Sequence, residues 1–201
     1  EEEEEGWVAL LRIAYFGGED GEAEVHALIK AGVDVNTPDE DGTTALMYAA
    51  HCGAQSENSG EGIIRALIDA GADLDKQTNI SRSTALMDAA YYGGLHGEAM
   101  VQILVGAGAD VNIQNEDGWT ALMLAVEAGD CSIRTMRVLV GAGADVNKKD
   151  THGTTALMLA ARFGKKYTET MISVLLESPD LAINAQDNDG YTALAYAASQ
   201  V

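Results

Sequence analysis

Short apolar segments separated by polar, glycine-containing stretches recur along this chain of 201 residues. The segment TALMYAAHC, at residues 44–52, starts with threonine and continues with small and large apolar residues. A second apolar run follows it, in which an aliphatic pair, Leu67-Ile68, precedes Gly71. Threonine is a favourable residue before the first turn of a helix, and glycine is favourable just past the last turn. The pattern therefore predicts two short helices joined by a loop.

This arrangement is repeated along the chain. The triplet Thr-Ala-Leu occurs five times, at steps of 40, 36, 35 and 37 residues. Its copies start at Thr44, Thr84, Thr120, Thr155 and Thr192. A second marker, AGADVN or a close variant, starts at Ala31, Ala70, Ala107 and Ala142, and an Asp-Gly or His-Gly pair precedes four of the triplets. Such a repeat predicts units of turn, helix, loop and helix, which bury their apolar faces only by stacking on one another.

With these three markers in a fixed order, the chain resembles the ankyrin-repeat family over almost its whole length. The resemblance implies an all-α repeat solenoid, in which helix-loop-helix units are joined by β-hairpin or turn fingers. We expect an acidic tail at residues 1–6 and a single array at 7–201. The expected units are about 7–40, 41–79, 80–116, 117–151 and 152–188, followed by a partial unit at 189–201.

The sequence departs from the family pattern in two regular ways. Alanine replaces the family's proline after each threonine cap, and methionine replaces its histidine at Met47, Met87, Met123 and Met158. This second exchange gives up a polar contact for flexible apolar packing. Every complete unit is also lengthened between its two helices, as from Gly53 to Gly71. Because loop lengthening costs little, two explanations stay open: common ancestry of the units, or a row of loops that binds a partner.

Composition and charge narrow the functional classes. The formal net charge of −20 repels phosphate backbones, so we expect neither nucleic acid nor an anionic membrane surface as a partner. No apolar run approaches the ~18 residues of a membrane span, and the chain begins with Glu1–Glu5 rather than a basic segment. The two cysteines, Cys52 and Cys131, are far apart and favour a reducing compartment. We therefore expect a cytoplasmic protein.

No residue pattern predicts catalysis or a cofactor. His51-Cys52 has no neighbouring residues to complete a zinc ligand set. The acidic turns at residues 39–42 and 187–190 lack the glutamate that a calcium loop needs at its last position. We expect no enzyme activity, no bound metal or cofactor and no small-molecule substrate.

The family resemblance implies that targets lie on the concave face, formed by the fingers and the ends of the first helices. Exposed aromatic residues there are typical interface anchors. The predicted partner-binding residues are Tyr15, Phe16, Tyr48, His51, Asp88, Tyr91, Tyr92, Trp119, Glu127, Arg162, Phe163 and Tyr191. For Tyr91 and Tyr92, packing between repeats is an equally open explanation.

The predicted function is a protein-interaction module without turnover. Acidic residues around the expected face, such as Asp41 and Asp117, predict a partner protein or peptide with basic and apolar character. Two alternatives remain at this point. The chain is a structural subunit of a large assembly, which contacts neighbours through its insert loops and open ends, or it is the targeting segment of a longer enzyme.

Overall fold

The computed structural model describes residues 2–18, 20–52, 60–92, 96–129, 132–163 and 168–199. Within these ranges every regular element is a helix and none is a β-strand. The helices are α1 Glu2–Phe16, α2 Gly21–Lys30, α3 Ala45–Cys52, α4 Glu61–Asp69, α5 Ala85–Tyr92, α6 Gly97–Gly106, α7 Ala121–Ala128, α8 Ile133–Gly141, α9 Ala156–Phe163, α10 Thr168–Leu175 and α11 Ala193–Ala198. The predicted all-α repeat solenoid is confirmed.

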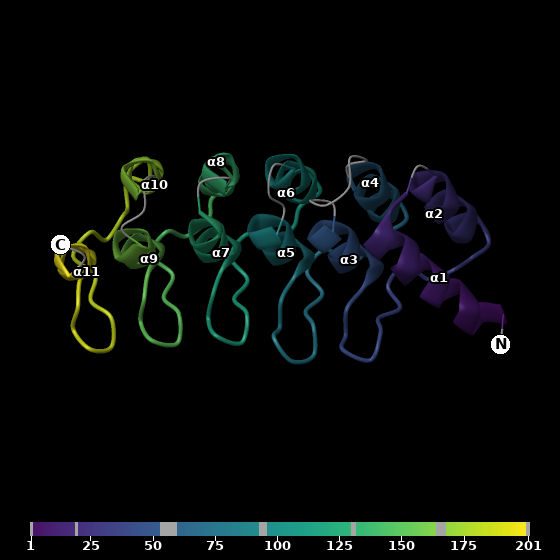
Figure 1. Cartoon of the computed structure of the whole chain (residues 1–201), viewed down its shortest axis with the longest axis horizontal. Helices are drawn as coiled ribbons and strands as arrows, with labels where there is room; N and C mark the ends of the chain where they lie inside the picture. Colours follow the sequence, from purple (N-terminus) through teal and green to yellow (C-terminus); the bar gives the residue numbers. More distant parts are fainter. Residues whose placement is uncertain are drawn as a thin grey trace.

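The helices form two parallel rows (Figure 1). One row holds α1, α3, α5, α7, α9 and α11, and the other holds α2, α4, α6, α8 and α10. Each helix packs beside the next helix of its own row and beside its partner in the other row. Loops shaped like hairpins extend from the first row on the side away from the second row. We call these loops the fingers.

The repeated threonine begins each helix of the first row from α3 onward. Its hydroxyl oxygen accepts a hydrogen bond from the backbone N–H three residues later, as from Met123 to Thr120 at 3.3 Å. The same bond occurs at Thr44, Thr84, Thr155 and Thr192. The following methionines are fully buried. In two units the methionine sulfur also accepts the N–H of the threonine, at 3.5 Å in Thr44 and 3.4 Å in Thr155.

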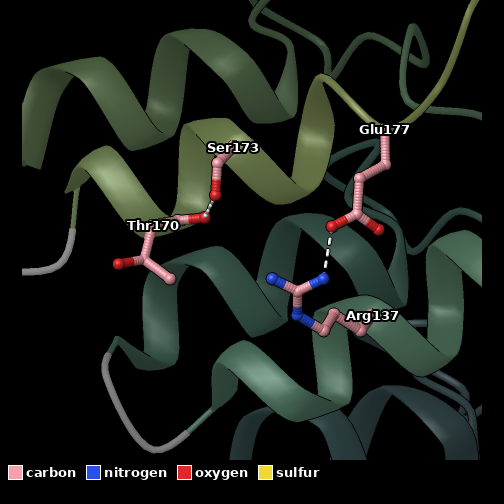
Figure 2. A network of polar contacts seen from close by, with 4 residues as sticks. All are labelled: Arg137, Thr170, Ser173 and Glu177. Atoms are coloured by element: carbon pink, nitrogen blue, oxygen red, sulfur yellow. Dashed lines mark hydrogen bonds and ion pairs between the residues drawn. The ribbon is translucent and has the colours of Figure 1, made fainter.

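The second row buries leucines and methionines against the first. Leu67, Leu104, Leu139 and Leu175 each have no exposed surface. On the outer surface, the Arg137 guanidinium of α8 donates to the Glu177 carboxylate, just past α10, and Figure 2 shows this ion pair. Its side chains are about half exposed, so it contributes at most about 1 kcal/mol. Burial of the apolar helix faces, rather than surface charge pairing, holds the row together.

The fingers are held by the same set of contacts in every unit. The first finger residue offers a side-chain oxygen to backbone N–H groups at the finger tip, as Asp39 does for Thr43 at 2.8 Å. The residues in this position are Asp39, Thr78, Asn115, Asp150 and Asp187. Each finger also donates one backbone N–H to the finger before it, at 2.9–3.0 Å. The fingers are therefore a continuous layer, although they contain no strand among the described residues.

The turn of each finger contains a residue whose backbone has a positive φ angle, in the left-handed region. Gly42, Gly118, Gly153 and Gly190 have φ between 78° and 85°. At Gly118 a Cβ would lie 2.9 Å from the backbone of Asp150, so only glycine lets the neighbouring finger approach. The second finger, which opens at Thr78, has one additional residue and no such glycine; Arg82 adopts φ 55° there instead. Its carbonyl accepts from the Gln77 amide at 2.7 Å, and its guanidinium donates to the Gln77 oxygen at 2.7 Å.

Two sequence expectations concern segments at the margins of this architecture. Of residues 1–6, expected to form an acidic tail, residues 2–6 belong to α1, which begins at Glu2, and residue 1 lies outside the described residues. The lengthened loops between paired helices fall largely on residues 53–59, 93–95, 130–131 and 164–167, which lie outside the described residues.

Candidate functional site

A groove of about 600 Å³ lies between the fingers and the first row of helices. We call it the central groove. Residues of α1, α3, α5 and α7 line one wall, and residues of the first, second and third fingers, such as Thr43, Ser83 and Asn115, line the other. Eight of the predicted residues lie here: Tyr15, Tyr48, His51, Asp88, Tyr91, Tyr92, Trp119 and Glu127.

Aromatic rings in the central groove contact one another across units. The Tyr15 ring of α1 lies edge-on to Tyr48 of α3, with centroids 5.5 Å apart. The His51 ring of α3 lies 4.1 Å from Tyr92 of α5, which meets Tyr91 edge-on at 4.7 Å. Burial lowers the pKa of His51, which favours its neutral, ring-like form. These contacts restrict the movement of the rings, and part of the surface of Tyr15, Tyr91 and Tyr92 stays exposed to solvent.

Tyr91 and Tyr92 both pack against other rings, and the His51–Tyr92 contact joins two units, whereas Tyr91 meets Tyr92 within α5. Their side chains are 39% and 47% exposed, although each packs against a neighbouring ring. Trp119 is half-buried against the core and lines the groove from the third finger. A rigid aromatic side chain that keeps part of its surface exposed loses little conformational entropy when a partner covers it.

Tyr48 is the most constrained of these aromatic residues. Its hydroxyl donates to Asp39 Oδ2 at 2.6 Å. That hydrogen bond, together with burial and the negative charge of Asp39, raises the pKa of Tyr48 to about 12. Tyr196 of α11 repeats the contact with Asp187 at 2.5 Å. Each of these tyrosines therefore connects a helix of the first row to the finger that precedes it.

Two carboxyl groups of the central groove have no such partner. The Asp88 side chain of α5 reaches the groove surface, but its carboxyl is deep enough that burial raises its pKa to about 7. Glu127 of α7 has one carboxylate oxygen, Oε2, that is fully buried without a hydrogen-bond partner. Both lie among aromatic and aliphatic side chains. Burial of a carboxylate oxygen without a hydrogen-bond or ion-pair partner is unfavourable in free energy.

A second hollow, of about 330 Å³, lies further along the fingers. Trp119 borders both hollows, and Arg162, whose guanidinium influences the pKa of Tyr196, borders this one. Phe16 and Tyr191 lie outside the linings of these two hollows and are 71% and 56% exposed. The Phe163 side chain is not among those that the structure describes.

Sequence reasoning omitted several residues that line the two hollows. Leu124, Leu159 and Tyr196 occupy the place, four residues after the threonine cap, that Tyr48 and Asp88 have in their own units. The register from the cap was sufficient to find them. Leu124 and Leu159 were omitted because aliphatic residues in a repeat suggest core packing, a reason that does not apply to Tyr196.

In the described ranges no group of three or more His, Cys, Asp or Glu side chains is placed to hold a metal ion. None of the helices in these ranges has both the length and the apolar character to cross a membrane.

Comparison with known proteins identifies the repeats. Sequence profiles of ankyrin repeats match residues 10–58, 54–150, 86–179 and 132–200. Over 103 residues the chain is 34% identical to "Ankyrin repeat and SAM domain-containing protein 6" of Mus musculus and of Rattus norvegicus. The aligned region is 51% of this chain but only 11% of each relative. Ankyrin repeats are typically non-catalytic and generally mediate protein–protein interactions. From the fixed order of its markers, its two rows of helices and these matches, the chain belongs to the ankyrin-repeat family.

Proposed function

We propose that this chain is a non-catalytic module that binds a segment of a partner protein in the central groove. The observation that carries the proposal is the gathering of partly exposed aromatic side chains from successive units. Tyr15, Tyr91 and Tyr92 come from α1 and α5, and Trp119 comes from a finger, yet all line one hollow of about 600 Å³. Large aromatic side chains in a shared hollow are the usual anchors of a protein interface.

Charge specifies the partner further. The chain carries 32 acidic and 12 basic residues, and exposed acids such as Glu40, Asp41 and Glu116 lie on the fingers beside the groove. A negative surface around an aromatic hollow favours a segment with basic residues on its flanks and apolar residues at its centre. The family's general role in protein binding agrees with this assignment.

Peptide selection tests the proposal without a known partner. Peptides selected from a random display library against the intact chain should be rich in basic and apolar residues. Tyr91→Ala combined with Trp119→Ala should weaken their binding at least tenfold, since each lost anchor costs roughly 1–2 kcal/mol. Isothermal titration calorimetry measures the change.

The matched control is Leu176→Ala combined with Ile183→Ala. These side chains are 53% and 57% exposed but lie outside the central groove, so this double variant removes comparable apolar surface elsewhere. It should bind the selected peptides like the unsubstituted chain. Equal binding by the groove variant, with its fold intact by circular dichroism, would show that the groove is not the binding site.

A further inference from the structure

The central groove contains two acidic side chains with unsatisfied oxygens: Asp88 has no hydrogen bond from the described residues, and Glu127 has one oxygen, Oε2, buried without a partner. Asp88 and Glu127 lie on α5 and α7, which pack side by side in the first row. The described residues that line the groove include no lysine and no arginine. Burial alone shifts the pKa of Asp88, since no hydrogen bond from the described residues offsets it. Among the described residues that line the groove, therefore, no lysine or arginine supplies a positive charge to these two groups.

The surroundings of the two carboxyl groups select the form of the cation. Tyr91 and Trp119 present ring surface, and Leu124 of α7 presents aliphatic surface in the same groove. A metal ion is a poor match, because hard cations take six or more oxygen ligands and the described residues offer no group of three metal-binding side chains. A lysine or arginine side chain matches both parts. Its alkyl stem packs on apolar surface, and its head pairs with carboxylates and aromatic faces.

We infer that the space beside Asp88 and Glu127 is a subsite for one lysine or arginine side chain of the partner segment. This inference rests on the proposed function and adds to it one cationic side chain at the centre of the bound segment. The basic flanks proposed above interact only with the overall negative charge of the chain. Arginine binds more tightly than lysine, since its planar head pairs with a carboxylate through two hydrogen bonds and loses less hydration.

The test uses peptide pools of one length, random except for a central arginine, lysine, norleucine or glutamate. Norleucine retains an alkyl stem and lacks the charge. The intact chain, immobilised, should retain the arginine and lysine pools at least about tenfold more than the norleucine pool. Asp88→Asn combined with Glu127→Gln should abolish this preference. Both changes leave side-chain shape almost unaltered, and thermal melting checks that the variant is folded.

A charge-matched control separates the subsite from the general field. Glu40→Gln combined with Glu116→Gln also removes two negative charges, from exposed finger residues outside the lining of the groove. This variant should keep the preference for the cationic pools. If the preference falls equally in both variants, or persists in Asp88→Asn with Glu127→Gln, the subsite is wrong. If Tyr91→Ala with Trp119→Ala still abolishes binding in that case, the proposed groove stands without it. Retention of no pool by the intact chain would overturn both.

Discussion

At the residue scale, one position of the repeat unit shows how different side chains use the same backbone. The fourth residue after the threonine cap is Tyr48 in α3, Asp88 in α5 and Tyr196 in α11. The two tyrosines donate to the aspartate that opens their own finger. The finger that precedes α5 opens with a threonine instead, Thr78, whose hydroxyl forms hydrogen bonds with Ser81 and Ser83. Asp88 therefore has no hydrogen-bond partner among the described residues. In this respect its unit differs from the units that contain Tyr48 and Tyr196.

Asp88 should make the stability of the protein depend on pH. Below about pH 4 the carboxyl is protonated in the folded and unfolded chains alike and has no effect. Between its ordinary pKa of 3.8 and its folded value of about 7, only the unfolded chain loses the proton. This contribution therefore lowers stability as pH rises through that window and levels off above it. Asp88→Asn should stabilise the chain by about 2–4 kcal/mol at about pH 8 and by almost nothing at about pH 3.

Urea unfolding at the two pH values measures this difference. Asp117→Asn is the matched control, because Asp117 also lines the central groove but lies on an exposed finger. It should show no comparable change between the two conditions. A stabilisation by Asp88→Asn that is equal at both values would mean that removal of the ionised carboxylate is not its cause.

At the element scale, the last residue of the AGADVN marker connects successive units. The Asn112 amide donates to the Gly143 carbonyl at 3.2 Å, and its oxygen accepts from the Asp145 N–H at 2.7 Å. Asn36 and Asn147 make the corresponding pairs of bonds to the units that follow them. The second unit has Asp75 instead, and its carboxylate only accepts, from the Asp110 N–H at 2.9 Å. A carboxylate has no proton for the second bond.

Asp75→Asn should therefore stabilise the junction between the second and third units. The new amide can donate to the Gly108 carbonyl, which corresponds to that of Gly143, and the expected gain is about 0.5–1 kcal/mol for an exposed bond. The reciprocal change, Asn112→Asp, should cost a similar amount. Chemical denaturation of both variants measures the pair. Destabilisation by both changes would show that the local surroundings of Asp75, rather than the missing donor, determine this position.

At the scale of the whole molecule, stability comes from stacking and is opposed by charge. The rows of helices bury one continuous apolar core along the array. The formal net charge is −20, and the ion pairs recorded among the described residues are largely exposed. Repulsion between the acidic side chains of this elongated chain is weakened by salt, because dissolved ions screen exposed charges. Burial of apolar surface is little affected by moderate salt.

Salt should consequently stabilise the folded chain. An increase from about 0.02 M to about 0.5 M NaCl shortens the screening length severalfold and should raise stability by about 1 kcal/mol, or the melting temperature by about 2–4 °C. Differential scanning calorimetry measures the change, and KCl in place of NaCl should give the same result. A lower melting temperature in salt would mean that attractive charge pairs outweigh the repulsion.

The repeats made most of the fold predictable, and the candidate site less so. A threonine before Ala-Leu has the same local role in every unit, so the starts of α3, α5, α7, α9 and α11 followed from the sequence. Asp88 and Glu127 were predicted for the binding face, but their lack of partners was not foreseeable. It depends on which residues the adjacent helix and finger present, and these come from units about 35–40 residues away in the sequence.

The sequence by itself determined the repeating unit, its helix caps, the left-handed glycines of the fingers and the acidic character of the chain, because each depends on residues that are close together in the chain or on simple totals. Only the tertiary structure decided that aromatic residues from α1, α3 and α5 share one groove with Trp119, and that two carboxyl groups are buried there without a partner. Stacking brings distant residues together and removes water from them, and both effects depend on the packed array rather than on any single unit.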